Sequence, residues 1–417
     1  MTVTHPASVI DAEAIGRISD RYDEPTWLRE LRADWLQRAE ATPPPTGQEE
    51  EWRRTSLEAL PRGAELLVDP PTLETHVPLS ALTAGVIVTD LRTAVREHPD
   101  LVRRFLGQVD GPTSHAHFWA LAQAVWTGGL FCYVPRGVAV DGTVVVRHTL
   151  PHADARFHPV SIVVAEERSS VTLLEEIVSP HGGAGWHGGI VDLRAGQDAQ
   201  VRYANLQQLG DGAWRVGAQR VAVAQDAVVT TLNAEVGSIV SKLGLDVLMI
   251  GKGGTSKVLG LLAAGDDQKI DINAVQDLAA DHTTSDLLYL SALYDRAHAS
   301  FYGITSVRHG TRQTSSYQEC RNLLLSPEAG AEPIPVLEIE ANDILRCGHG
   351  ATAGAIDPTT LFYAQTRGLD AAAAERMIVR GFFEQVVAQI VDPTIRERIL
   401  ASLAGRIGTE THDEVAA

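Results

Sequence analysis

The stretch from Leu130 to about Ala355 places the strongest constraint on the fold of this chain. It consists of short apolar or alternating runs, such as TVVVRHTL and VSIVVAE, separated by Gly, Asp and Asn. Such runs are typical of β-strands. Units of one turn and one strand recur at a spacing of 28 or 29 residues, beginning near Ser170, Ala199, Ala227 and Thr255. This recurrence favours stacked β-coils, although a sandwich or barrel has the same strand content and stays open.

The segments on either side of this stretch have helical patterns. Residues 1–128 form one expected helical region, whose proline-rich, acidic part near 42–50 predicts a loop. Its expected helices lie at 24–35, at 91–109 with a break at Pro99, and at 114–126. Residues 356–417 form a second helical region. We therefore expect three domains, with a β core over 129–355 between two helical regions.

Start and stop signals locate the terminal helices. Asp357 is an expected N-cap with Pro358 at the first helical position, and Gly368 is an expected helix end. Asp370 can cap a longer helix, and Asp392-Pro393 repeats the starting signal. An apolar stripe predicts the packed face of the longer helix, over Ile378, Phe382, Val386 and Ile390, widened by Phe383 and Val387.

Cys347 and His349 follow the last expected strand. Residues two apart on an extended backbone face the same way, so the sulfur and the imidazole share one face. A closed zinc or iron–sulfur site needs four ligands, and this pair supplies two. Two interpretations stay open: a packed cysteine beside a hydrogen-bonded histidine, or half of a metal site that a partner chain completes.

Two other motifs carry weaker signals. Histidines cluster in sequence at 148, 152, 158, 181 and 187, but Pro151 excludes the helical metal-binding geometry, so we expect surface or loop residues. Residues 251–257 (GKGGTSK) miss the spacing of a phosphate-binding loop and predict a β-turn. The sequence has no metalloprotease, nucleophile-elbow or kinase motif. We therefore expect a protein that is not an enzyme.

Composition limits the partners and the compartment. The 417 residues have a net charge of −18, which argues against a nucleic-acid surface and against an anionic membrane. The N-terminus has no basic and apolar signal pattern, and no apolar run has the length of a membrane span. Three cysteines do not make a disulfide framework. We expect a cytoplasmic protein.

Several motifs resemble the SufB/SufD family of iron–sulfur cluster assembly scaffolds. The similarity is specific over 281–390 and looser over most of the chain. It rests on Cys347-Gly348-His349-Gly350-Ala351-Thr352, Leu361-Phe362-Tyr363, Arg367-Gly368-Leu369, Ala374-Glu375-Arg376, Gly381-Phe382, the run 318–326 and, more weakly, Trp52-Arg53-Arg54-Thr55. The resemblance favours a mainly β fold, with a right-handed parallel β-helix flanked by helical regions.

The resemblance also indicates which paralogue this chain is similar to. SufB-like chains carry a cysteine after the leucine-rich run and a glutamate after the histidine, whereas Ala329 and Gly350 stand at these positions here. A thiolate is the natural persulfide acceptor and iron ligand. The chain is therefore identified as a SufD-like member.

The resemblance implies a non-catalytic scaffold subunit of a SufB–SufC–SufD complex. It places His349, and less firmly Cys347, at the contact with SufB, where a transient iron–sulfur cluster assembles and His349 is a metal ligand shared with the partner. It implies that the terminal helices dock the ATPase SufC, with candidate residues Leu361, Phe362, Tyr363, Arg367, Gly368, Phe382 and Phe383. Flavin use stays open. The alternatives are a β-helix carbohydrate-active enzyme and the SufB-type scaffold itself.

Overall fold

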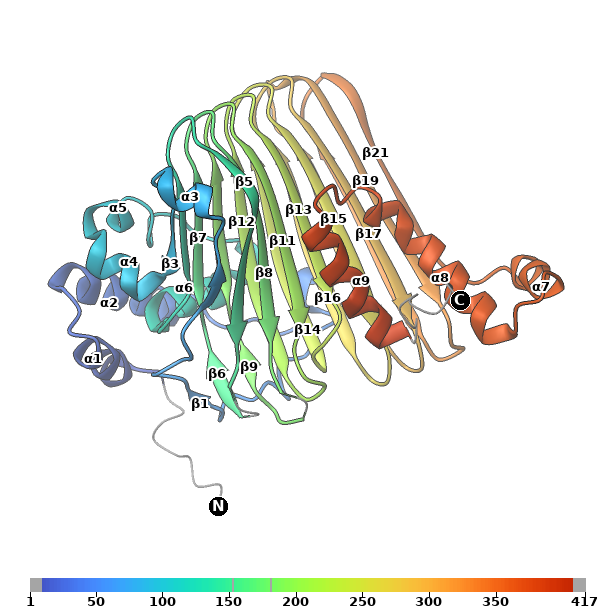
Figure 1. The fold of residues 1–417 in the computed structure, drawn as a ribbon, viewed down its shortest axis with the longest axis horizontal. Coiled ribbons are helices and arrows are strands. Elements are labelled where there is room, and N and C mark those ends of the chain that lie inside the picture. The colour runs from blue at the N-terminus through green and yellow to red at the C-terminus, as the bar shows by residue number, and fades with distance from the viewer. Residues whose placement is uncertain (1–9, 152–153, 181, 408–417) are drawn as a thin grey trace.

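The computed structural model describes residues 10–151, 154–180 and 182–407. Its centre is a parallel β-solenoid of about eight turns, in which each coil adds a strand to each of two facing sheets (Figure 1). Helices of the N-terminal region lie beside one end of the solenoid, and the C-terminal helices lie beside the later coils (Figure 1). The expected mainly β architecture with helical flanks is confirmed.

The strands alternate between the two sheets along the chain. The 12-stranded sheet has the order β20-β18-β16-β14-β12-β10-β7-β4-β3, with β1, β6 and β9 off this path, and the nine-stranded sheet has the order β2-β5-β8-β11-β13-β15-β17-β19-β21. The strands of the first sheet are β1 (Glu65–Leu66), β3 (Ile87–Asp90), β4 (Leu130–Val134), β6 (Ala155–Phe157), β7 (Val160–Ala165), β9 (Trp186–His187), β10 (Ile190–Ala195), β12 (Trp214–Val223), β14 (Val240–Met249), β16 (Lys269–Leu278), β18 (His298–Val307) and β20 (Gly330–Ile339). Those of the second are β2 (Glu74–His76), β5 (Ala139–Thr149), β8 (Ser170–Val178), β11 (Gln200–Gln208), β13 (Val228–Glu235), β15 (Thr255–Ala264), β17 (Thr284–Leu293), β19 (Arg312–Leu324) and β21 (Asp343–Ala355).

The helices fall outside the coils. The α-helices are α1 (Ala12–Arg21), α2 (Thr26–Ala41), α3 (Leu79–Thr83), α4 (Leu91–Glu97), α5 (Pro99–Arg103), α6 (Ala116–Val125), α7 (Pro358–Thr366), α8 (Ala371–Val387) and α9 (Pro393–Ile407). Two 3₁₀ turns, η2 (Glu50–Trp52) and η3 (Thr113–His115), lie in the N-terminal region. The break expected at Pro99 separates α4 from α5, and the N-terminal region adds three short strands that the sequence did not indicate.

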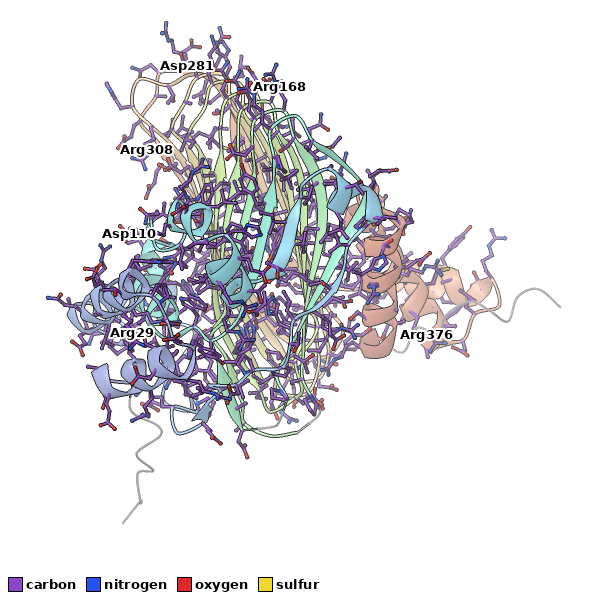
Figure 2. The ribbon with its side chains drawn as sticks, turned by 60° about the vertical axis from the view of Figure 1, so that its left-hand side comes forward. Arg29, Asp110, Arg168, Asp281, Arg308 and Arg376 are labelled. Atoms are coloured by element: carbon purple, nitrogen blue, oxygen red, sulfur yellow. The ribbon has the colours of Figure 1, made fainter. Side chains whose placement is uncertain are left out.

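The sequence recurrence is the length of one coil. Successive strands of the nine-stranded sheet pair in register, which aligns Gln200, Val228, Thr255 and Thr284 in one column. The corners between strands take left-handed backbone conformations at Asp198, Asp226, Asp266 and Asp295. Asp tolerates this conformation better than most residues, which explains why Asp recurs between the apolar runs of the sequence. Figure 2 shows that Arg168, another such corner, and Asp281, in a later coil, lie along the same edge of the coils.

Apolar side chains form separate cores on both sides of each sheet. The solenoid interior holds a continuous apolar cluster that includes Val163, Leu193, Leu245 and Leu287. The outer face of the 12-stranded sheet packs against the N-terminal helices through residues such as Trp119 and Trp214, and the outer face of the nine-stranded sheet packs against α8 and α9. Burial of this apolar surface is the main stabilising contribution to the fold.

The prediction of surface histidines was wrong for the three that the structure describes, although His158 does lie in a loop, between β6 and β7. His148, His158 and His187 are buried inside the first coils, while positions 152 and 181 lie outside the described residues. His148 Nε2 lies 2.6 Å from Glu175 Oε1, and Ser161 and Tyr203 donate hydrogen bonds to the same carboxylate. Burial alone would raise the pKa of Glu175, but these hydrogen bonds lower it. Polar residues inside the coils are accommodated here through mutual hydrogen bonds.

Candidate functional site

The two ends of the solenoid differ in how their strand edges are covered. At the first coil, β2 and β3 pair in antiparallel fashion with β5 and β4. At the last coil, β20 and β21 end their sheets, and neither has a second neighbouring strand among the described residues. An uncovered edge presents unpaired backbone N–H and C=O groups that can pair with another chain. The last coil is therefore the open end of the solenoid.

Cys347 and His349 lie on β21 and face the inside of this open end. In register, Cys347 pairs with Ser316 of β19 and His349 pairs with Gln318. Ser316 and Gln318 are buried and point into the solenoid, as does Cys320 two positions further on. Residues in register on parallel strands point the same way. His349 is nevertheless exposed and Cys347 half-buried, because β21 is the last strand of its sheet.

The layer beneath this pair is polar. Both amide atoms of Gln318 are buried without a hydrogen-bond partner among the described residues, and so is Thr314 Oγ1. Asn322 Nδ2 donates to the Thr352 carbonyl at 2.9 Å and lies 3.6 Å from Cys320 Sγ. Burial raises the pKa of the Cys320 thiol to about 12. Cys320 is therefore a packed thiol, while Gln318 keeps unused hydrogen-bonding capacity below His349.

The pair does not complete a metal site by itself. Among the residues that the structure describes, no group of three or more His, Cys, Asp or Glu side chains is placed to hold a metal ion. Burial also raises the pKa of the Cys347 thiol, which favours the protonated form over the thiolate that binds metal. Within the described residues, His349 and Cys347 thus supply two of the four ligands that a closed site needs.

The helix α7 carries exposed aromatic side chains next to the open end. The Asp357 side chain accepts from the Thr359 backbone N–H, which confirms the expected N-cap. Phe362 is 65% exposed and Tyr363 is 60% exposed. Figure 1 shows α7 projecting beyond the last coils. Arg367 holds Tyr363 through an Nη2 to OH hydrogen bond of 3.0 Å, and Gly368 takes φ +98° after the helix end.

The apolar stripe of α8 agrees with the expected one at most positions and differs at its edge. The buried face of α8 includes Val379, Phe383, Val386 and Val387, which pack on the nine-stranded sheet together with Ile390, beyond the end of the helix. Phe383 is 2% exposed, whereas Phe382 and Ile378 are only partly buried. Phe383, Val386, Val387 and Ile390 of the expected stripe are thus confirmed as packed residues, whereas Val379 is buried instead of Ile378, because the sequence does not show which side of the helix meets the sheet. Phe383 is therefore a core residue in this chain.

Comparisons with known proteins agree with this architecture. The family model described as "SUF system FeS cluster assembly, SufBD core domain" matches residues 148–382, more than half of the chain. A second model, "SufBD protein N-terminal region", matches residues 56–146. The chain belongs to the SufBD family.

Curated SufBD relatives are similar over much of their length. The iron–sulfur cluster assembly protein SufD of Bacillus subtilis is 27% identical over 95% of this chain and 98% of its own. A SufBD family protein of Staphylococcus saprophyticus is 26% identical over 73% of this chain and 66% of the relative. One from Mycobacterium tuberculosis is 30% identical over 54% of this chain and 59% of the relative. This SufBD protein is thus an iron–sulfur cluster assembly protein of the SufD-like type.

The structure adds one observation on membranes. No helix of this SufBD chain, within the described ranges, is long and apolar enough to cross a bilayer.

Proposed function

We propose that this chain is a non-catalytic, SufD-like scaffold subunit of a cytoplasmic SufB–SufC–SufD complex that assembles iron–sulfur clusters. Family membership and the similarity to SufD along nearly the whole chain support this role. Ala329 is buried at the start of β20 and carries no thiol at the position where the SufB-type resemblance calls for one, which argues against the SufB role. The family match also argues against a carbohydrate-active β-helix.

One observation carries the proposal: an incomplete Cys–His pair sits in the open end of the solenoid. The uncovered edges of β20 and β21 suit pairing with the corresponding strands of a SufB-like chain. Such pairing brings ligands of the partner opposite His349 and Cys347. A transient iron–sulfur cluster is then built at the contact, as the product of assembly, with His349 as the ligand from this side.

The helices α7 and α8 are the proposed contact for a SufC-like ATPase. Phe362 and Tyr363 form an exposed aromatic pair, and aromatic residues dominate the energetics of protein interfaces. Half-buried Leu361 lies beside them, Arg367 fixes the Tyr363 ring, and Phe382 reaches the surface of α8. Phe383 supports this surface from below by packing on the nine-stranded sheet. Nucleotide-driven motion of the ATPase would thus reach the solenoid through α8.

Co-purification tests the proposed SufB contact. Leu345 on β21 is 70% exposed and Val391, between α8 and α9, is 77% exposed. Leu345→Asp places a charge at the open end and should abolish recovery of the SufB-like subunit from co-expressing cells. Val391→Asp is the matched control and should leave recovery unchanged. Undiminished recovery with a folded Leu345→Asp variant would place the SufB contact elsewhere.

A further inference from the structure

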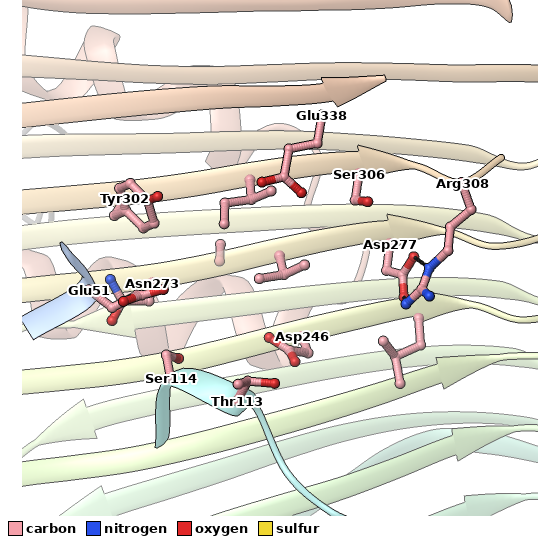
Figure 3. Close-up of a pocket in the computed structure, with 14 residues that line it drawn as sticks. Glu51, Thr113, Ser114, Asp246, Asn273, Asp277, Tyr302, Ser306, Arg308 and Glu338 are labelled. Carbon is pink, nitrogen blue, oxygen red and sulfur yellow. Dashed lines mark hydrogen bonds and ion pairs between the residues drawn. The ribbon is translucent and has the colours of Figure 1, made fainter. Parts of the chain in front are cut away.

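A cleft of about 390 Å³ lies on the outer face of the 12-stranded sheet, away from the His349 site. Its floor is formed by β14, β16, β18 and β20, and its wall by the N-terminal segments at Glu51 and at Thr113 and Ser114 (Figure 3). This volume is in the range of small-ligand sites. Neither the family match nor the proposed assembly role assigns it a purpose.

The wall of the cleft is held firmly. Lys242 Nζ lies 2.7 Å from Asp271 Oδ2, and Thr55 Oγ1 donates to the same oxygen at 2.6 Å. Gly244 gives room for His115, whose Nδ1 would lie 2.3 Å from an added Cβ. Lys242, Asp271 and Thr55 are all buried. The N-terminal segment is therefore fixed against the sheet, and the cleft is a preformed cavity.

Asn273 on the cleft floor has unused hydrogen-bonding capacity. It is 3% exposed, and neither Oδ1 nor Nδ2 has a partner among the described residues. Figure 3 shows the amide beside Glu51 at one end of the cleft. An unsatisfied buried polar group costs about 1–3 kcal/mol, so native structures rarely keep one without a reason. A ligand that both donates and accepts a hydrogen bond, such as an amide, would satisfy Asn273.

The cleft is also anionic. Asp246 makes no hydrogen bond or ion pair within the described part of the chain, whereas Asp277 is paired with Arg308 through bonds of 2.7 and 2.6 Å. Burial, together with the Asp277 charge, raises the pKa of Asp246 to about 7. Glu338 lies on the opposite side of the cleft from Asp246 (Figure 3). Arg220 of β12 stands in register beside Asp246 and favours its ionisation, but Arg220 Nη1 lies 3.3 Å from Asp192 Oδ1, so Arg220 is shared with a second carboxylate. A further cation at Asp246 would offset the remaining cost of this buried carboxylate.

The spacing of the two groups indicates the ligand. Asn273 pairs in register with Gly244, so Asp246 lies one strand away and two residues along. Strand geometry puts the two Cα atoms about 8 Å apart. An extended arginine or lysine side chain joins its charged group to its own amide over a similar distance. We propose that the cleft binds a guanidinium or alkylammonium group attached to an amide, as in an arginine or lysine residue, with the cation at Asp246 and the amide at Asn273.

Calorimetric titration of the purified full chain tests this binding with three probes. Blocked arginine amide should bind. Blocked citrulline amide, which is neutral, and butylguanidinium, which lacks the amide, should each bind about tenfold more weakly, because each loses one anchoring interaction. The ligand could be a peptide segment of a partner or a free small molecule, and a blocked tripeptide with a central arginine distinguishes the two. If it binds more tightly than blocked arginine amide, the ligand is a peptide segment. If it binds more weakly, the ligand is a free small molecule.

Variants connect binding to the two named residues. Asn273→Leu and Asp246→Asn keep the branching of each side chain and should weaken the binding of blocked arginine amide about tenfold, while Glu328→Gln, an exposed change outside the cleft, should not. Circular dichroism verifies that each variant is folded. The proposal is overturned by equal affinity for the arginine and citrulline probes, by unchanged binding in both variants, or by no binding to the wild type at about 10 mM.

Discussion

His349 of β21 stands in register over Gln318 of β19, and the two side chains point to the same side of the nine-stranded sheet. His349 is exposed at the open end, whereas Gln318 is buried, and both of its amide atoms lack a hydrogen-bond partner among the described residues. Gln318 also lies against Gly303, where an added Cβ would come within 2.2 Å of Nε2. A polar residue without partners under a surface histidine suits a layer that is completed only when a second chain covers it.

Replacement of Gln318 should stabilise the isolated chain. Gln318→Leu removes two unsatisfied polar atoms at similar volume, so we expect the free energy of unfolding to rise by about 1–3 kcal/mol. The matched control is Gln276→Leu, because Gln276 donates to Ser285 and accepts from Thr305 inside the same coils. This control should lower the stability. Urea denaturation measures both, and a loss of stability in Gln318→Leu would show that its amide is satisfied in solution.

Replacement of Phe383 should affect mainly stability, whereas replacement of Phe362 should affect mainly binding of the SufC-like ATPase. Phe383→Ala empties a core position and should cost about 3–5 kcal/mol of stability. Phe362→Ala removes an exposed ring and should change stability by less than about 0.5 kcal/mol. If α7 docks the SufC-like ATPase, Phe362→Ala should still weaken its pull-down about tenfold. Normal ATPase binding by folded Phe362→Ala and Tyr363→Ala variants would remove α7 from the contact.

Asp246 should make stability depend on pH near neutrality. Its pKa of about 7 in the folded chain exceeds the ordinary aspartate value of 3.8, so the folded state binds the proton more tightly and stability falls as pH rises between these values. Asp277 opposes its ionisation and Arg220 favours it. The free energy of unfolding of Asp246→Asn should therefore exceed that of the wild type by about 1–2 kcal/mol at pH 8, allowing for solvent screening, and should equal it below pH 4. The measurement is the urea midpoint of the wild type and of Asp246→Asn as a function of pH. If the two midpoints change with pH in the same way, the pKa of Asp246 is not raised in the folded chain.

The sequence predicted the elements whose signals are local. The spacing of turn residues predicted the coils, and Asp357, Pro358 and Asp370 predicted where α7 and α8 begin, because caps and corners depend on a few adjacent residues. The strand period also placed Cys347 and His349 on one face. These features need no knowledge of distant contacts.

Features that depend on distant contacts could not be predicted. The buried face of α8 is set by the sheet beneath it, so Val379 is buried where Ile378 was expected, and Phe383, which was also a candidate docking residue, is fully packed. The burial of His148 was missed because its partner Glu175, to which Ser161 also donates, lies in another strand. Asn273 and Asp246 gave no signal, since neither belongs to a motif and only the solenoid brings them together. Pairings across coils are invisible to local pattern rules.

The central claim, that the open end shares an assembly site with a second chain, depends most directly on His349. Neutral imidazole can bind iron or hold a proton near a sulfur, and alanine can do neither. Cys347→Ser should have a milder effect if the half-buried thiol is mainly packed, and an equal one if it is a ligand. Recovery of the complex is measured in parallel, so that failure to assemble is distinguished from failure to build clusters.

The decisive measurement is the activity of an iron–sulfur enzyme in cells that lack this subunit and are complemented with His349→Ala. We expect normal recovery of the SufB–SufC–SufD complex, because His349 is exposed and its loss removes no core packing, together with a loss of most of the enzyme activity. Full complementation by His349→Ala would contradict a shared site at the open end.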